Sequence, residues 1–331
     1  MTNYAIRAEG LTKHYGATKA LDGIDLAVPE GSVLGVLGPN GAGKTTAVRI
    51  LATLLRPDSG TATVAGHDVL KDPNAVRRSI GLTGQYASVD EQLTGRENLE
   101  LFARLLDFTR PDARARAAEL LGQFGLDEAG DRRAKTYSGG MRRRLDLAAS
   151  LVGRPAVIFL DEPTTGLDPS KRDDVWNMVR LLTSEGTTVL LTTQYLEEAD
   201  ALADAITVID VGTVIAHGTA SELKQIVGGR SLQVRPQDVR DIADIRAILS
   251  RITGRPVGEP TRGLLTAPIG AEQQFTNVVA DLASRGIPVT EISLSLPSLD
   301  EVFFTLTGQG ASRPAAADTD TDTDTDKELV P

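Results

Sequence analysis

The segment from Gly38 to Thr46, GPNGAGKTT, carries the residue types that bind phosphate groups. It matches the pattern G-x-x-x-x-G-K-[ST] of a phosphate-binding loop at every fixed position. In such a loop the glycines let backbone N–H groups surround phosphate oxygens, and the N-terminus of the following helix adds partial positive charge. The residues expected to bind the phosphates of a nucleotide are Gly38, Pro39, Asn40, Gly41, Ala42, Gly43, Lys44, Thr45 and Thr46.

Lys44 and Thr45 have separate expected roles within this loop. The Lys44 ammonium should reach the β- and γ-phosphates and so take part in catalysis, and the Thr45 hydroxyl should bind Mg²⁺. Chance alone gives this pattern in on the order of 1% of chains of this length at ordinary residue usage. The segments on either side of the loop make a chance match less frequent still. Residues 32–37 are a short apolar run typical of a buried parallel strand, and residues 45–55 have the pattern of an amphipathic helix.

Two adjacent carboxylates, Asp161 and Glu162, directly follow the apolar run of residues 156–160. Parallel sheets place their ligands at the carboxyl ends of strands, and a buried acid without a partner is costly. A nucleotide site therefore explains the pair better than a stray surface position does. Asp161 fits a carboxylate ligand of Mg²⁺, and Glu162 fits the base that orients or deprotonates the attacking water.

Two weaker candidates have ordinary structural alternatives. Tyr15 could stack on a nucleotide base, but it could equally be a half-buried strand residue. Ser138, Gly139 and Gly140 open a helix, where they could bind an anion or could serve only as an N-cap.

The elements that must position these residues alternate along the chain. We expect antiparallel strands within residues 4–28 beside the sheet of the phosphate loop, and a closing hairpin at residues 206–216. Further strands are expected at 61–65, 80–84, 156–160 and 187–192, and helices at 73–78, 97–106, 112–124, from 138 onward and at 196–203.

The order of the expected elements and the change in composition predict three regions. Residues 1–229 form the nucleotide-binding domain, with a helical subdomain at about 87–152. Residues 230–309 form a small α+β domain with its own strand and helix rhythm. Residues 310–331 form a Thr-Asp tail that cannot bury a core and should be disordered.

Composition excludes several classes of protein. The 331 residues are 41% hydrophobic, which is enough for a sizeable core. The formal net charge is −10, of which residues 318–331 supply −5, so the balance argues against a nucleic-acid groove. The chain has no cysteine, no apolar signal core at its start and no apolar run near the roughly 18 residues needed to span a bilayer. We expect a cytoplasmic protein whose membrane work needs a partner.

Taken together, the motifs resemble an ATP-binding-cassette (ABC) ATPase across about the first two-thirds of the chain. The family order is a phosphate loop, Gln85 in a glutamine loop, a signature at residues 137–141, Asp161-Glu162, and Gly166-Leu167-Asp168 as an aspartate loop. This resemblance implies an α/β fold with a phosphate-loop, RecA-like nucleotide-binding domain and a helical subdomain. It also implies that Gln85 serves Mg²⁺ and catalysis, and that Asp168 and the Ser138-Gly139-Gly140 segment contact ATP in a dimer that sandwiches two ATPs.

Three segments narrow the resemblance to the daunorubicin-resistance ATPase subfamily of drug exporters, namely residues 138–145, 192–200 and 299–303. The subfamily implies a homodimer on a separate integral-membrane permease at the cytoplasmic face of the membrane, exporting a hydrophobic antibiotic. The signature departs from the usual Leu-Ser-Gly-Gly-Gln because Tyr137 and Met141 replace its first and last residues.

Gln194 is a second departure, since most ABC ATPases have a histidine after this strand. Its amide can donate a hydrogen bond to a phosphate oxygen but cannot shuttle a proton. We expect Gln194 to be catalytic, with the alternative that it lies out of contact range.

Two other classes of function agree less well with the residues than the exporter. A small-molecule kinase or GTPase leaves the signature segment unexplained, and the chain has no Asn-Lys-x-Asp motif. A soluble ABC ATPase acting on DNA or ribosomes would be expected to show two cassettes, cysteine-bound zinc or a coiled coil, and a basic face. The exporter subunit therefore agrees best with the residues.

Overall fold

The computed structural model describes residues 3–84, 88–226, 230–260, 263–295, 299, 302 and 303. Its centre is a six-stranded sheet of order β10-β9-β3-β8-β7-β6, in which all neighbours are parallel except β10, which pairs antiparallel with β9. The strands are β3 (Val33–Leu37), β6 (Ile80–Thr83), β7 (Val157–Asp161), β8 (Thr188–Thr193), β9 (Ala205–Asp210) and β10 (Thr213–Gly218). Every residue of β3, β7 and β8 is buried, which explains why these strands are continuous apolar runs.

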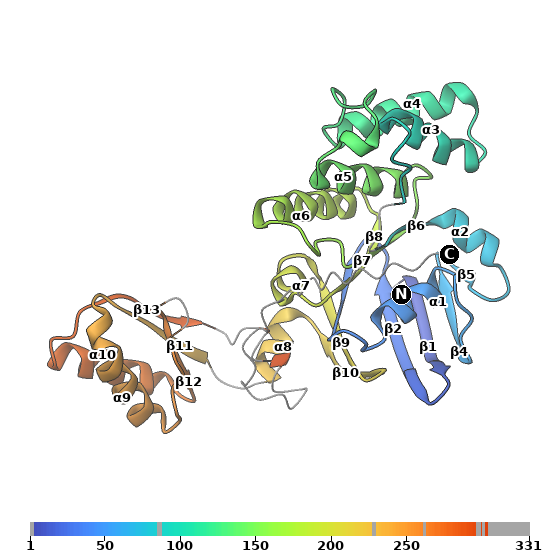
Figure 1. The fold of residues 1–331 in the computed structure, drawn as a ribbon. Helices are drawn as coiled ribbons and strands as arrows, with labels where there is room; N and C mark the ends of the chain where they lie inside the picture. Colours follow the sequence, from blue (N-terminus) through green and yellow to red (C-terminus); the bar gives the residue numbers. More distant parts are fainter. Residues whose placement is uncertain are drawn as a thin grey trace, which may run out of the picture.

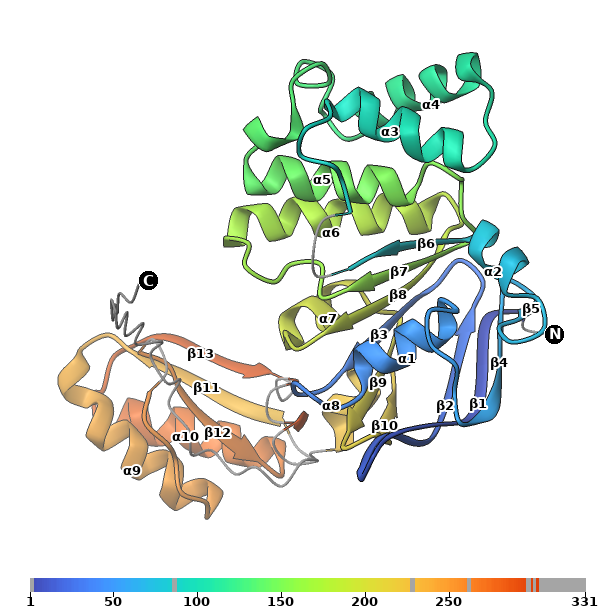
Figure 2. The same cartoon turned by 45° about the vertical axis from the view of Figure 1, so that its right-hand side comes forward.

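A second, antiparallel sheet has the order β2-β1-β4-β5. Its strands are β1 (Tyr4–Tyr15), β2 (Thr18–Pro29), β4 (Ser59–Val64) and β5 (His67–Asp68). Helix α1 (Lys44–Leu51) contacts β2, β4 and β7, so it packs between the two sheets and shares one apolar core with them (Figure 2). The expected antiparallel strands beside the phosphate-loop sheet are thus confirmed.

Helices build a layer beyond β6, β7 and β8 (Figure 1). They include α3 (Gly95–Leu105), α4 (Arg110–Gln123), α5 (Gly139–Ser150) and α6 (Pro169–Ser184), which surround one apolar cluster. Thr94 and Glu97 form a reciprocal capping box that starts α3, and Thr109 caps α4. The remaining helices of the cassette are α2 (Pro73–Ser79), α7 (Leu196–Leu202), α8 (Ala220–Ile226) and the 3₁₀ turn Ala134–Thr136.

The C-terminal part has its own three-stranded antiparallel sheet of order β12-β11-β13 and its own apolar core. Its elements are β11 (Arg230–Pro236), the 3₁₀ turn Val239–Asp241, α9 (Ile242–Thr253), β12 (Leu265–Ile269), α10 (Glu272–Ser284) and β13 (Val289–Ser295). After β13 the chain returns to the cassette, where Leu299 and Val302 are buried in a cluster with Leu37 of β3 and Ala199 of α7.

The fold class expected from the sequence is confirmed, including the extra α+β part, although helix and strand ends shift by a few residues. Helix α6 was not predicted, although the spacing of Val175, Val179 and Leu182 marks its buried side. Helix α8 was also missed. The expected boundary at residues 227–229 and the tail at 310–331 lie outside the described residues.

Candidate nucleotide-binding site

A pocket of about 480 Å³ lies at the carboxyl edge of the parallel sheet. It collects residues from the loop after β3, from the end of β7 and from the end of β8, as expected for a ligand site in a parallel sheet. The residues that line it are Ala20, Asn40, Gly41, Ala42, Gly43, Lys44, Thr45, Thr46, Asp161, Glu162, Thr165 and Gln194.

Close backbone approach requires glycine at two positions of the loop. A Cβ at Gly43, which has a φ of 110°, would lie 2.3 Å from the carbonyl oxygen of Ala20. A Cβ at Gly38 would lie 2.2 Å from the carbonyl oxygen of Ile209. Both oxygens belong to backbone that cannot move aside, so a larger residue at either position would displace the loop.

Lys44 is held almost completely inside this loop, with 4% of its surface exposed. Its Nζ donates to the carbonyl oxygens of Gly38 at 2.7 Å and Pro39 at 3.1 Å, and lies 3.7 Å from Oε1 of Glu162. Burial lowers the pKa of Lys44, and the negative charges of Glu162 and Asp161 act in the opposite direction. The ammonium therefore has a fixed position at the floor of the pocket.

Asp161 joins the loop to two strands. Its Oδ1 accepts from Oγ1 of Thr45 at 3.2 Å and from Oγ1 of Thr192 at 2.5 Å. Asp161 and Thr192 are paired across β7 and β8, so the parallel register brings them together. The Asp161 carboxylate and the Thr45 hydroxyl offer hard oxygen atoms, which Mg²⁺ prefers as ligands. Mg²⁺ takes most of its other ligands from water and phosphate. Thr45 and Asp161 therefore fit the predicted metal site.

Glu162 lies in the left-handed backbone region, with a φ of 50°. Its N–H donates to the carbonyl oxygen of Thr192 at 3.1 Å, and its Oε2 accepts from Oγ1 of Thr165 at 3.2 Å. This turn directs the carboxylate back over the pocket instead of along the strand. Gln194 lines the same pocket from the end of β8.

Three comparisons with known proteins agree with this geometry. The ABC transporter family model matches residues 21–165. The chain is 55% identical to the daunorubicin resistance ATP-binding protein DrrA2 of Streptomyces coeruleorubidus, over 96% of this chain and 99% of that protein. The chain belongs to the ABC transporter ATP-binding proteins of the daunorubicin-resistance type. A doxorubicin resistance ATP-binding protein DrrA of Mycobacterium tuberculosis is 48% identical over 92% of this chain and 93% of its own length.

Solved cassettes share the fold of this ABC ATPase. The chain resembles cbiO1 of Clostridium perfringens with a TM-score of 0.63 and 27% identity, covering 68% of this chain and 93% of that one. It also resembles the cassette MJ0796 in a dimeric post-hydrolysis state bound to ADP and phosphate, with a TM-score of 0.59 and 25% identity, covering 65% of this chain and 98% of that one. The chain is thus an ABC ATPase that binds ATP and hydrolyses it for transport.

Other predicted site residues of the ABC ATPase do not line the pocket. Ser138 caps α5 by accepting from the N–H of Met141 at 3.3 Å, and Gly139 and Gly140 lie in the first turn of that helix. Asp168 caps α6 and pairs with Lys171, whose methylenes lie against Gly140. The signature and the aspartate loop of one copy therefore touch each other away from the phosphate loop.

Tyr15 lies outside the pocket and is 50% exposed, with Nζ of Lys13 6.0 Å from its ring centre. The expected Gln85 lies outside the described residues. Tyr137, the first departure from the family signature, is buried, and its hydroxyl donates to the carbonyl oxygen of Ala129 at 2.7 Å.

Sequence reasoning missed Ala20, Thr165 and Thr192. Thr192 could have been found, because it ends the strand that neighbours the Asp161 strand in a parallel sheet. Ala20 had no signal, since it reaches the site only through the packing of the antiparallel sheet.

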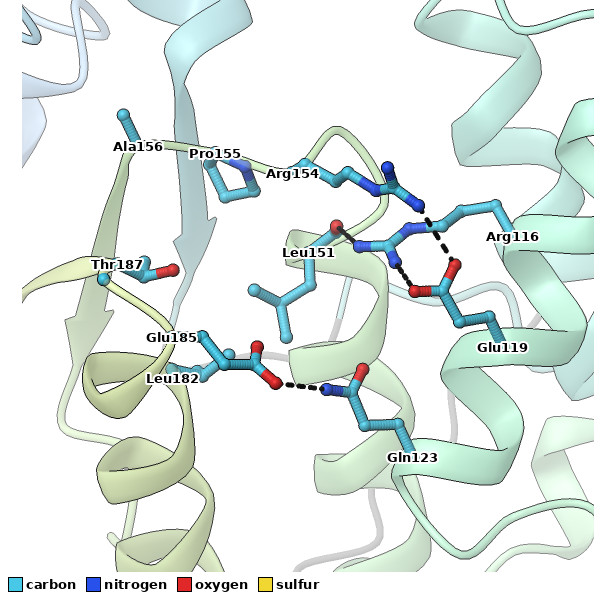
Figure 3. A pocket seen from close by; sticks show the side chains of 11 residues that line it. Arg116, Glu119, Gln123, Leu151, Arg154, Pro155, Ala156, Leu182, Glu185 and Thr187 are labelled. Carbon is cyan, nitrogen blue, oxygen red and sulfur yellow. Dashed lines mark hydrogen bonds and ion pairs between the residues drawn. The ribbon is translucent and has the colours of Figure 1, made fainter.

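A second cavity of about 350 Å³ lies between α4 and α6 (Figure 3). It opens beside Ala156 and Thr187, at the amino ends of β7 and β8 and thus at the edge opposite to the phosphate loop. Its arginines, Arg116 and Arg154, both pair with Glu119. Glu185 is a second carboxylate of the lining, so two arginines face two carboxylates and the cavity is less suited to phosphate than the phosphate loop.

Proposed function

We propose that this ABC ATPase energises the export of a hydrophobic antibiotic of the daunorubicin type, working as a dimer on a separate membrane permease. The observation that carries the proposal is the pocket itself, in which the phosphate loop, Lys44, Asp161 and Glu162 surround one space, in a chain 55% identical to daunorubicin resistance proteins. Daunorubicin and doxorubicin are the compounds named for the relatives. For this chain, we propose that the permease partner selects the compound that is exported.

Hydrolysis follows from the positions of the side chains. Backbone N–H groups of the loop and the Lys44 ammonium hold the β- and γ-phosphates. Glu162 accepts a proton from water while the water oxygen bonds to the γ-phosphorus and the bond to the bridging oxygen breaks, giving ADP and phosphate. Gln194 donates a hydrogen bond to the developing charge on the phosphate.

A magnesium ion held by Thr45 and Asp161 would supply positive charge that neutralises the β- and γ-phosphate oxygens. The direct 3.2 Å contact between Thr45 and Asp161 supports this assignment, because it brings the two oxygen atoms that would bind the metal to one point of the pocket. Gln85 is proposed as a further ligand from the family resemblance.

The complete site is proposed to need two copies of the chain. Ser138, Gly139 and Gly140 would bind the γ-phosphate held by the phosphate loop of the other copy, and Asp168 would lie at the same interface. The separation of these residues from the pocket within one copy supports this arrangement, as does the likeness to a cassette solved as a dimer.

The permease is proposed to contact the helical layer. Leu101, Leu105 and Leu106 of this layer are exposed, and an apolar cavity of about 220 Å³ lies beside Leu105 and Leu106. No described helix is long and apolar enough to cross a bilayer. The ATPase is proposed to lie at the cytoplasmic face of the membrane, bound to this permease. The alternative is an ABC ATPase acting on DNA or ribosomes without a permease.

The test combines Glu162→Gln with the exposed control Glu128→Gln. Cells that express the chain together with a candidate permease partner are loaded with daunorubicin, and efflux and ATP turnover are both measured. Glu162→Gln should lower turnover by at least about a hundredfold and abolish efflux, while Glu128→Gln should match the wild type. Efficient turnover with no efflux of any hydrophobic drug would support the alternative, and normal turnover by Glu162→Gln would remove Glu162 as the base.

A further inference from the structure

Glu198, on α7, is a buried acid that the hydrolysis scheme does not use. It is 1% exposed. Neither of its carboxyl oxygens makes a hydrogen bond of standard geometry within the described part of the chain, and the same is true of Oγ1 of Thr164 and Nε1 of Trp176. An acid in this state costs stability, so its presence calls for a physical explanation.

The groups that face Glu198 are mostly donors. The hydroxyls of Thr193 and Thr164 and the indole of Trp176 lower the pKa of its carboxyl group, as does the positive charge of Arg172. Arg143 also feels the charge of Glu198. Burial raises the pKa of Glu198, and these donors act against that rise. These side chains lie near enough to influence the carboxyl group, although no hydrogen bond of standard geometry to it is formed in the described part of the chain.

Each donor comes from a loop or helix tied to the nucleotide pocket. Thr164 follows Glu162 by two residues, and Thr193 directly precedes Gln194. Trp176 lies on α6, whose N-cap is Asp168. Glu198 therefore faces the three segments that carry the proposed base, the proposed phosphate donor and the aspartate loop.

Arg172 also connects the Gln194 segment to the aspartate loop. Its guanidinium lies 4.8 Å from the ring centre of Tyr195, the residue after Gln194. Its Nε donates to the carbonyl oxygen of Leu167 in the aspartate loop at 3.3 Å. The Gln194 loop and the aspartate loop are thus joined both by a stacked cation and by the buried acid.

We propose that Glu198 is a positioning residue for ATP hydrolysis, whose carboxylate accepts hydrogen bonds from Thr164, Thr193 and Trp176 and so fixes the loops of Glu162, Gln194 and Asp168. The inference rests on the proposed roles of Glu162 and Gln194. Glu198 touches neither nucleotide nor water, since it does not line the pocket. Its effect should fall on the rate of the chemical step, whereas nucleotide binding depends on Lys44 and the phosphate loop.

A purely structural role predicts the opposite pattern of effects. If Glu198 served only to fold the chain, replacing it would lower stability and nucleotide binding together. An incompletely partnered buried acid does not favour folding, so a positioning role predicts a loss of kcat that is larger than any loss of stability or of nucleotide affinity. Retention of a destabilising acid beside reactive groups is the pattern expected of a functional position.

The test compares Glu198→Gln with Glu197→Gln, an exposed neighbour on the same helix. The Gln amide would present N–H groups to donors, so the loops should lose their alignment. For the full chain we expect kcat to fall by about tenfold to a hundredfold, as for a small misplacement of reacting groups. Affinity for a fluorescent ATP analogue should stay unchanged. Emission of Trp176, the single tryptophan of the chain, should change in Glu198→Gln and not in Glu197→Gln.

Single-donor variants keep the test decisive if Glu198→Gln folds poorly. Thr164→Val removes one donor while preserving shape, and Trp176→Phe removes the indole N–H with a smaller aromatic ring; each should lower kcat with unchanged analogue affinity. Combining Glu198→Gln with Thr164→Val should cost little more than Glu198→Gln alone, because both act through one contact. Wild-type kcat in Glu198→Gln, or a parallel loss of kcat, affinity and unfolding temperature, would overturn the proposal. Loss of turnover in Glu162→Gln alongside normal Glu198→Gln would leave the proposed function standing.

Discussion

Glu162 combines two features that stability alone does not favour. It is a residue with a side chain at a φ of 50°, and its carboxylate lies in a pocket beside the buried ammonium of Lys44 at 3.7 Å. Backbone strain of this kind costs on the order of 1–3 kcal/mol and persists only where the surroundings hold it. Thr192 does so here, because both its carbonyl and its hydroxyl oxygen accept from the Glu162 N–H. The turn directs the carboxylate into the pocket.

Gln194 lies in the same pocket, in the position where most ABC ATPases have histidine. If its amide donates to the transition-state charge, Gln194→Ala should lower ATP turnover by about thirtyfold to a thousandfold, which corresponds to roughly 2–4 kcal/mol. The measurement is kcat under saturating Mg·ATP, with the exposed Gln92→Ala as the control. An unchanged turnover number in Gln194→Ala would remove this residue from the catalytic list.

At the scale of elements, Arg116 joins two helices of the helical layer, α4 and α5. It is a buried residue of α4 whose Nη2 and Nε donate to the carbonyl oxygens of Leu151 and Val152, at the end of α5, at 2.7 and 3.3 Å. The last carbonyls of a helix have no partner within it, so this side chain caps α5 from the neighbouring helix. Arg116 also pairs with Glu119 at 2.6 Å (Figure 3).

Arg116→Met should therefore destabilise the cassette by about 2–4 kcal/mol, because two buried carbonyls and one carboxylate lose a charged donor. Urea unfolding followed by Trp176 emission measures this change. Arg114→Met, whose side chain is 75% exposed, should have little effect. Equal midpoints for the two variants would show that water replaces the Arg116 guanidinium without cost.

The strands at the site could be predicted from sequence because each is a short apolar run with a chemical motif at its carboxyl end. The phosphate loop, Asp161-Glu162 and Gln194 all follow such runs, so a parallel sheet must gather them. Helix α6 was not predicted, although Asp168 and Pro169 are ordinary helix-start residues and the aspartate loop leads directly into them. Glu198 and Arg172 could not have been placed, since their environment arises from the packing of α6 against α7.

At the scale of the whole molecule, the C-terminal part is linked to the nucleotide pocket by two routes along the chain. It follows α8 directly, and beyond β13 Leu299 and Val302 return to a cluster with Leu37. Leu37 directly precedes Gly38, the first residue of the phosphate loop. Ala199, on the same helix as Glu198, belongs to this cluster as well. Leu299 and Val302 therefore pack against β3 and α7, the elements next to the phosphate loop and the Gln194 segment.

The proposed dimer predicts how much ATP turnover a mixture of two inactive variants recovers. Ser138→Arg should retain ATP binding in the monomer but lose turnover, because Ser138 serves the nucleotide of the partner. Lys44→Ala should lose ATP binding at the phosphate loop of its own copy. In a dimer of one copy of each, the intact phosphate loop faces the intact signature, so one working site remains and the other site carries both defects.

An equal, freely exchanging mixture should therefore recover up to about a quarter of the wild-type rate, since half of the dimers are mixed and each has one of two sites. Turnover measured on the mixture, against each variant alone, checks this expectation. If the two sites must act together, the mixture stays inactive although Ser138→Arg still binds ATP. If Ser138→Arg loses ATP affinity as severely as Lys44→Ala, then Ser138 serves its own copy, and the composite site is excluded.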